Sequence, residues 1–498
     1  MTTEKEIVLG YATQDKTRGA GVYPVPMNLK RANRHGLIAG ATGTGKTVTL
    51  QALAESFSQQ GVPVFLADVK GDISGISQPG KSHPKVNERL QALGLPIDQW
   101  RGCPTVFWDL YGKQGHPIRA TISDMGPVLL SRLMGLNETQ EGVLNIAFAV
   151  ADDNGLLLLD LKDLRAMLRH VSATAAELGS IYGNVSASSV GAIQRRLLVL
   201  ERSGAKKFFG EPMLELDDLI QVDANGAGFV NVLVASKLVQ EPAVYSTLLL
   251  WLMSELFENL PEVGDPEKPK LVVFFDEAHL MFKNTPQALI DKIEQVVRLI
   301  RSKGVGVYFI TQSPGDIPDS VLAQLANRVQ HALRAFTPKE QKAVRSAAQT
   351  FRSDKSFSVQ NAISEMGIGE ALISTLMANG APSIVKRAMV KPPVSRIGAA
   401  KKAELHEILR QSSFAEKYDT AIDRESAFEK LAQRTAVAAK AAAAKKPTPK
   451  RAHAAPKPRG RPRQSIAETF VKSVVRSLGG RSGRALVRGI LGSLFKGR

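Results

Sequence analysis

Eight consecutive residues near the amino end of the chain have the composition and spacing of a phosphate-binding loop. Residues 40–47 read Gly-Ala-Thr-Gly-Thr-Gly-Lys-Thr and fit the pattern G-x-x-x-x-G-K-[ST]. Gly43 and Gly45 let the backbone curl so that several N–H groups point inward at a polyphosphate. Lys46 can bring its ammonium to the β- and γ-phosphates, and the Thr47 hydroxyl can ligate Mg²⁺. The pattern predicts a nucleotide site made of Gly40, Ala41, Thr42, Gly43, Thr44, Gly45, Lys46, Thr47 and Val48.

The residues on either side of this loop decide whether the pattern is more than a Gly/Thr-rich surface turn. Before it, residues 35–39 read as a short buried strand. After it, apolar side chains recur at helical spacing as far as Phe57, and no proline occurs until Pro63. A strand, a glycine loop and a helix in this order are the context that a phosphate-binding loop requires.

Two further polar positions follow apolar runs that read as strands. Asp276 and Glu277 come directly after residues 271–275, and Gln312 comes directly after residues 305–311. Strand carboxyl ends face the ligand in a parallel sheet, so we predict that Asp276 holds Mg²⁺ and that Glu277 polarises the attacking water. Gln312 would sense the γ-phosphate. The alternatives are an acidic pair that caps the next helix and a glutamine that caps a turn.

Two arginines and one aspartate have roles that the residues leave open. Arg298 and Arg301 lie three apart on one face of a helix predicted at about 286–303. Either can be an arginine finger that reaches the nucleotide of a neighbouring subunit, or both can belong to a solvated helix face. Asp68 ends the predicted strand 63–68, where it either assists the Mg²⁺ shell or caps the following turn.

Composition and charge narrow the class of protein. The chain has 498 residues, 44% of them hydrophobic, and no apolar run approaches the roughly 18 residues of a membrane-spanning helix. The amino end lacks the features of a signal peptide, and the single cysteine, Cys103, excludes an intramolecular disulfide and a cysteine-based zinc site. These features predict a cytoplasmic protein. The net charge of +18 is concentrated in residues 434–498, which contain 17 Lys and Arg residues and one acid.

The basic end of the chain contains two kinds of sequence. Residues 437–464 are dominated by Ala, Lys, Pro and Arg and are predicted to be disordered. Within them Arg459, Gly460, Arg461 and Arg463 resemble the core of an AT-hook, a segment that enters the minor groove of A·T-rich DNA. The alternative is a generic basic linker. Residues 465–498 predict basic amphipathic helices that lie on an anionic membrane surface, dock on a partner or pack on the protein itself.

Alternating strands and helices predict an α/β fold with a mostly parallel sheet. A stretch dominated by helical periodicity predicts an insertion within this core. The predicted parts are an N-terminal β element at 1–34, the first part of the core at 35–123, a helical insertion at 124–215, the second part of the core at 216–399, a helical linker at 400–436, the disordered basic segment at 437–464 and the basic helices at 465–498.

Several of these motifs together resemble those of the HerA–FtsK superfamily of P-loop ATPases, and within it the bacterial HerA-like (YjgR-like) group. The resemblance covers about residues 5–400. It rests on residues 33–38 running into 40–47, on 68–72, 274–279 and 311–314, and on 327–335 through to 367–371.

The resemblance implies a RecA-like core, assembly into a homo-oligomeric ring that is often hexameric, and ATP-driven translocation on DNA. By motif match it assigns Lys46 and Thr47 to ATP and Mg²⁺, Asp276 to Mg²⁺, Glu277 to catalysis and Gln312 to sensing. We therefore expect Mg²⁺-dependent ATP hydrolysis coupled to DNA translocation or remodelling, as in a helicase or translocase. The rival functions are a nucleotide-switched assembly or scaffold protein and an ATPase that energises transfer at the inner membrane.

Overall fold

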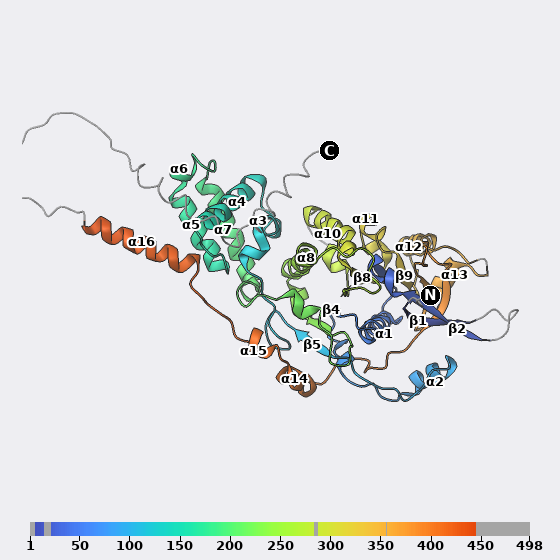
Figure 1. Ribbon diagram of the computed structural model, residues 1–498. Coiled ribbons are helices and arrows are strands. Elements are labelled where there is room, and N and C mark those ends of the chain that lie inside the picture. Colours follow the sequence, from blue (N-terminus) through green and yellow to red (C-terminus); the bar gives the residue numbers. More distant parts are fainter. Residues whose placement is uncertain (1–4, 14–20, 283–286, 355, 445–498) are drawn as a thin grey trace, which may run out of the picture. The chain divides into compact units, whose positions relative to one another are not determined.

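The computed structural model describes residues 5–13, 21–282, 287–354 and 356–444 (Figure 1). The predicted AT-hook-like residues Arg459, Gly460, Arg461 and Arg463 and the basic helices at 465–498 lie outside the described residues. The chain divides into two compact units. Residues 1–120 and 199–422 form the first, and residues 121–198 and 423–498 form the second.

One sheet of 11 strands organises the first unit. From β9 to β5 every neighbouring pair is parallel, whereas β2, β1, β11 and β10 pair antiparallel and join the sheet through β9. The mostly parallel sheet predicted from the sequence is confirmed. In spatial order the strands are β2 (Val22–Asn28), β1 (Glu6–Thr13), β11 (Lys386–Val390), β10 (Glu370–Ser374), β9 (Asn327–Gln330), β3 (Gly36–Ala39), β8 (Val305–Thr311), β7 (Leu271–Phe275), β4 (Val64–Asp68), β6 (Val230–Val234) and β5 (Thr105–Trp108).

The central strands are apolar along their whole length because helices cover both faces of the sheet. Consecutive residues of a strand point to opposite faces, as Phe274 and Phe275 of β7 do. Phe274 packs against Phe57 of α1 (Lys46–Gln59), with ring centroids 6.2 Å apart. Phe275 lies instead with apolar side chains of α8 (Pro242–Asn259) and α10 (Gln287–Ile300), such as Leu250 and Val297. Two-sided burial explains why these strands lack the alternating pattern of half-exposed ones.

Smaller elements complete the first unit. Near the antiparallel strands, α12 (Pro338–Gln349) and α13 (Val359–Glu365) form a separate apolar cluster with Leu372 and Val385. Near β5, α14 (Lys402–Gln411) packs Leu405, Ile408 and Leu409 against the main core. The other helices of this unit are α2 (Pro84–Ala92), α9 (His279–Phe282), α11 (Asp319–Leu322) and α15 (Ala415–Tyr418).

The regular elements of the second unit are helices throughout its described residues. The helical insertion predicted at 124–215 overlaps residues 121–198 of this unit, whereas residues 199–215 belong to the first unit. Buried Asp163 ties two of its helices together, because its carboxylate accepts hydrogen bonds from the Phe428 N–H (2.9 Å) and the Leu159 N–H (2.9 Å). The helices are α3 (Ile122–Leu133), α4 (Glu138–Asp153), α5 (Leu161–Ala173), α6 (Ala175–Leu178), α7 (Ala187–Arg202, which continues into the first unit) and α16 (Ala427–Ala444).

The prediction of a disordered segment from residue 437 onward is wrong at its start. Helix α16 continues through Ala444, into the alanine-rich part of that segment. Alanine has the highest helix propensity of all residues, so a run of alanines extends a helix that tertiary contacts have already started.

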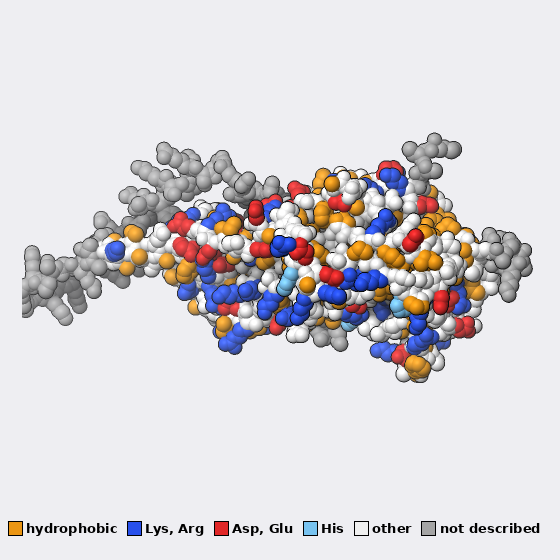
Figure 2. Space-filling model, turned by 90° about the horizontal axis from the view of Figure 1, so that it is seen from below, with side chains coloured by type: hydrophobic (Ala, Val, Ile, Leu, Met, Phe, Trp, Pro, Cys, Tyr) orange, Lys and Arg blue, Asp and Glu red, His pale blue; other side chains and the backbone are white. Residues whose placement is uncertain are grey.

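Surface charge in the described residues is mixed. Figure 2 shows Lys and Arg side chains across the face in view, with Asp and Glu side chains among them. This agrees with the net charge of about +2 that the sequence assigns to residues 1–433. No helix in the described part of the chain is both long and apolar enough to cross a membrane.

Candidate nucleotide-hydrolysis site

The glycine loop lies where the sequence predicts, between the buried strand β3 and helix α1. Gly43 and Gly45 have φ angles of 77° and 117°, in a backbone region that residues other than glycine rarely adopt. The Thr44 hydroxyl donates to the Ala41 carbonyl across the loop at 2.7 Å. Thr42 is exposed, whereas Thr47 is half-buried at the start of α1 and so is Val48. A hydrogen bond within the loop therefore closes it, and the loop runs directly into the amino end of α1, where backbone N–H groups are free to bind an anion.

Residues from the strands beyond β3 hold this loop in place. The Ala41 N–H donates to the Ala332 carbonyl at 2.8 Å, and the Gly369 N–H donates to the Thr44 carbonyl at 2.9 Å. A Cβ atom on Gly45 would lie only 3.3 Å from the Gly369 Cα. The loop thus depends on close backbone approach from a segment more than 300 residues away in sequence.

Buried His331 lies directly beneath the loop. Its Nδ1 is 2.8 Å from the Glu370 carbonyl oxygen and its Nε2 is 2.8 Å from the Thr49 hydroxyl. A carbonyl only accepts, so Nδ1 carries the proton and Nε2 accepts from Thr49. Burial, opposed by the hydrogen bond to the Glu370 carbonyl and assisted by the nearby Lys46 ammonium, lowers the pKa of His331 to about 4, so the ring is neutral at pH 7. The sequence analysis did not identify this residue.

The Lys46 ammonium is turned back onto the loop. Its Nζ donates to the Gly40 carbonyl at 2.6 Å and to the Ala41 carbonyl at 3.1 Å. Burial lowers the pKa of Lys46 and the Lys70 ammonium lowers it further, while Glu277 and Asp276 oppose both effects. Phosphate oxygens are stronger acceptors than these carbonyls, so the residues present fit a bound polyphosphate.

Asp276 follows β7 at the same edge of the sheet as the loop. Its side chain is buried, and within the described part of the chain its Oδ2 has no hydrogen-bond partner. Burial, although partly offset by the Lys70 ammonium, raises the pKa of Asp276 to about 7. An unpartnered buried carboxylate oxygen is costly unless a cation or donor compensates it. This oxygen therefore fits a Mg²⁺ site.

Glu277 is held by two side chains and has a left-handed backbone, with φ at 47°. The Lys70 Nζ lies 2.5 Å from Glu277 Oε1, and the Gln312 Nε2 donates to Oε2 at 3.4 Å. Burial alone would raise the pKa of Glu277, but these two partners and His279 hold it below its ordinary value. Glu277 is therefore ionised and oriented, which is the state that a general base requires.

The turn after β4 explains how Lys70 reaches Glu277. Both carboxylate oxygens of Asp68 accept from this turn, from the Gly71 N–H at 2.7 Å and the Ile73 N–H at 3.1 Å. Of the two roles considered for Asp68, the structure shows the turn cap. The Asp68–Asp72 stretch supported the family resemblance, but a lysine in a polar turn did not indicate that it pairs with Glu277, which follows β7.

Arg298 and Arg301 lie at the opposite edge of the sheet from the glycine loop. Both are exposed, Arg298 in α10 and Arg301 in the 3-10 turn Arg301–Lys303 that precedes β8. Strand β8 runs parallel to β3, so its amino end lies away from the loop that follows β3. The predicted common helix face is therefore interrupted at Arg301. Neither arginine lies beside the site of its own chain.

The parallel sheet, the glycine loop after β3 and the acidic pair after β7 define a P-loop ATPase with a RecA-like core. The chain belongs to the helicase HerA-like C-terminal family, whose model matches residues 13–498. The predicted resemblance to the HerA–FtsK superfamily is confirmed.

Two curated relatives carry the description DNA double-strand break repair helicase HerA. The protein from Sulfurisphaera tokodaii is 22% identical over 73% of this chain and 66% of its own length. The protein from Sulfolobus acidocaldarius is 20% identical over 70% of this chain and 64% of its own length. The matches thus span less than two thirds of either relative.

Among solved structures, the plasmid coupling protein TrwB in complex with the non-hydrolysable GTP analogue GDPNP has the same fold. The TM-score is 0.50 at 14% sequence identity, over 80% of this chain and 98% of TrwB. At this level of identity the likeness concerns the fold alone.

Proposed function

We propose that this P-loop ATPase hydrolyses ATP with Mg²⁺ to translocate on DNA or remodel it, as one subunit of a homo-oligomeric ring. The observation that carries the hydrolytic part is the pairing of an unpartnered Asp276 oxygen with an ionised, doubly held Glu277. The DNA part of the proposal is supported by membership of the helicase HerA-like family. It is also supported by the two curated relatives, each of which is described as a DNA double-strand break repair helicase.

Each residue of the site has a distinct role in this proposal. Lys46 leaves the Gly40 and Ala41 carbonyls and neutralises phosphate charge, while Thr47 and Asp276 hold the metal. Mg²⁺, when bound, neutralises charge on the phosphate oxygens. Glu277 accepts a proton from the attacking water, and Gln312, which donates a hydrogen bond to Glu277, senses the γ-phosphate.

The position of Arg298 and Arg301 supports assembly into a ring. An exposed arginine at the edge opposite to the glycine loop cannot contact the nucleotide bound by its own subunit, but it can reach the nucleotide of a neighbouring subunit. Charge neutralisation in trans couples hydrolysis between subunits, which is what a ring motor requires. We propose a ring on this basis, with either arginine as the finger, and six subunits because the family resemblance implies a hexamer.

The basic end of the chain is the proposed DNA tether. Arg459, Gly460, Arg461 and Arg463 would enter a minor groove, and the other lysines and arginines of residues 445–498 would contact phosphates. Binding of this kind weakens steeply as salt rises, because each phosphate contact releases a counterion.

An ATPase assay over a titration of duplex and single-stranded DNA tests the proposal. The assay compares the full chain with a chain that ends at Ala444, which keeps α16 intact. We expect DNA to accelerate hydrolysis by the full chain, and the shortened chain to need more DNA and to show a smaller salt dependence. Equal hydrolysis with and without DNA would refute DNA-coupled activity and favour a nucleotide-switched scaffold.

A further inference from the structure

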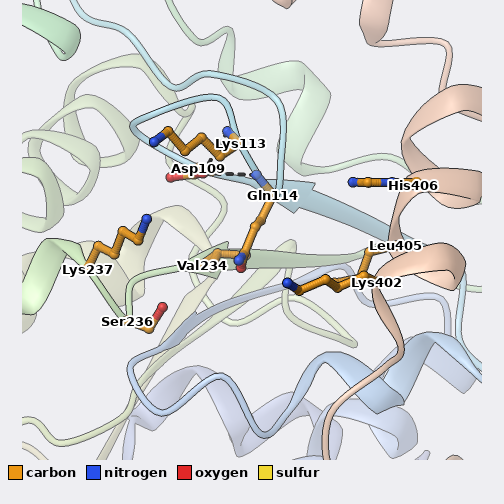
Figure 3. Close-up of a pocket in the computed structure, with 9 residues that line it drawn as sticks. All are labelled: Asp109, Lys113, Gln114, Val234, Ser236, Lys237, Lys402, Leu405 and His406. Carbon is orange, nitrogen blue, oxygen red and sulfur yellow. Dashed lines mark hydrogen bonds between the residues drawn. The ribbon is translucent and has the colours of Figure 1, made fainter.

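A cavity lies at the same edge of the sheet as the glycine loop, but several strands away from it. It has a volume of about 270 Å³ and lies where β5 and β6 end. In the sheet, β8, β7 and β4 separate β3 from β6, and the cavity includes no residue of the loop. Its lining residues are Asp109, Lys113, Gln114, Val234, Ser236, Lys237, Lys402, Leu405 and His406 (Figure 3).

Positive charge dominates this cavity. Lys113, Lys237 and Lys402 come from three separate segments, and none forms an ion pair with an acid in the described part of the chain. In Figure 3, Lys237 and Lys402 extend toward the same space from opposite sides, with Gln114 and Ser236 between them. All three lysines are exposed, and three positive charges around one cavity favour the binding of an anion there.

The one carboxylate in the lining does not neutralise these lysines. Asp109 accepts from the backbone N–H groups of Tyr111 (2.9 Å), Lys113 (2.9 Å) and Gln114 (3.0 Å). It caps the loop after β5, so its oxygens are already occupied. Asp109 therefore shapes the cavity wall and leaves the lysine ammoniums free for a ligand.

The rest of the lining combines the polar side chains of Gln114, Ser236 and His406 with two apolar ones, Val234 and Leu405. Val234 ends β6, and Leu405 belongs to the face of α14 that packs against the main core. A cavity that combines apolar walls with a few polar groups is the usual form of a small-ligand site. Its volume of about 270 Å³ lies just below the usual range of about 300–1,000 Å³. A continuous nucleic acid strand is better served by an open groove than by a single small cavity.

We propose that this cavity is a second nucleotide site, which takes a nucleoside phosphate with its phosphates on Lys113, Lys237 and Lys402 and its base against Val234 and Leu405. The ligand would sit at the same edge of the sheet as the hydrolysis site, but separate from it. A nucleotide bound there can regulate the ATPase without being hydrolysed. The proposal stands independently of DNA-coupled hydrolysis, because its test measures nucleotide binding and labelling and does not depend on turnover.

The test measures binding of a fluorescent ADP derivative, mant-ADP, to the full chain without Mg²⁺. A Lys46→Ala background weakens the P-loop site. We expect saturable binding in this background, weakened at least about 10-fold when Lys237→Ala and Lys402→Ala are added, as expected for lost charge-assisted hydrogen bonds. The matched control is Lys342→Ala, which removes an exposed lysine of α12 and should leave affinity unchanged.

Three results would overturn the proposal. One is no saturable binding in the Lys46→Ala background, and another is equal affinity with and without the two cavity substitutions in variants whose melting temperatures match. The third is displacement by a single-stranded oligonucleotide but not by unlabelled ADP, which would make the cavity a nucleic acid contact.

A measurement on the unsubstituted chain guards against a folding defect in the variants. ADP oxidised to its 2′,3′-dialdehyde forms an imine with a nearby lysine amine and releases water, and borohydride then reduces the imine. Peptide mapping should find the label on Lys113, Lys237 or Lys402 as well as at the P-loop. Label at the P-loop alone would contradict a second site.

Discussion

Lys70 offers the sharpest prediction about the hydrolysis site, because the ion pair with Glu277 was visible only in the structure. The variant is Lys70→Met, which removes the ammonium but keeps the length of the side chain. Without its partner at 2.5 Å, Glu277 loses both an orienting contact and a nearby positive charge that lowers its pKa. We expect kcat for ATP hydrolysis to fall while KM changes by less than about 3-fold, because the substitution affects the base rather than the loop.

The magnitude follows from the exposure of the pair. Removing one partner costs about 0–1 kcal/mol for an exposed ion pair and about 3–5 kcal/mol for a buried one. The Glu277 side chain is 8% exposed and that of Lys70 is 39% exposed, so the pair is intermediate. A cost of about 1–2 kcal/mol corresponds to a loss of about 5- to 30-fold in kcat.

Steady-state phosphate release with saturating ATP and Mg²⁺ is the assay, and two comparisons make it specific. Lys386→Met is the matched control, since Lys386 forms a comparable half-exposed ion pair with Asp354 at 3.2 Å, and it should leave kcat unchanged. In a Glu277→Gln background, Lys70→Met should add almost nothing, because the two residues act as a unit. A normal kcat in Lys70→Met, or full additivity in the double variant, would refute the reasoning.

The remaining predictions concern the base, the loop and the histidine beneath it. Glu277→Gln should bind ATP normally but hydrolyse it at least about 100-fold more slowly, as filter binding and phosphate release would show; near-normal turnover would remove Glu277 from catalysis. Gly45→Ala should weaken nucleotide binding at least about 10-fold in a calorimetric titration, since it forces a side chain into a left-handed backbone against Gly369; unchanged affinity would mean that the loop relaxes at no cost. Buried neutral His331 has a folded-state pKa of about 4, below its unfolded value of 6.5. Its contribution to the free energy of unfolding is therefore fully present above pH 6.5 and is lost as pH falls toward 4. At roughly 1.4 kcal/mol per pH unit, protonation of the ring should reduce the free energy of unfolding by on the order of 3 kcal/mol over that pH range. In His331→Gln, the free energy from urea unfolding should depend less on pH in this range, and an identical pH profile would contradict a buried neutral ring.

The parts of the site that could be predicted are those encoded locally. The glycine loop and its flanks fit within about 25 residues, and Asp276, Glu277 and Gln312 each follow an apolar strand directly. A parallel sheet brings the carboxyl ends of its strands to one edge, so position in the chain was enough to group these residues. Residue spacing and strand polarity therefore carry the chemistry in this class of fold.

The parts that could not be predicted depend on contacts between distant segments. Lys70 meets Glu277 only because β4 lies next to β7, and His331 reaches Thr49 only because β9 lies next to β3. Strand order is set by packing of the whole chain, which no local pattern encodes. The location of Arg301 at the opposite edge likewise followed only once β8 was known to be parallel to β3.

A crystal structure of the protein with a non-hydrolysable ATP analogue and Mg²⁺ tests the central claim most directly. We predict that the Lys46 Nζ leaves the Gly40 and Ala41 carbonyls for a phosphate oxygen, and that Asp276 Oδ2 faces the metal or one of its water ligands. Contradiction would be a loop without nucleotide, in which Lys46 still bonds its own loop and Asp276 Oδ2 still lacks a partner.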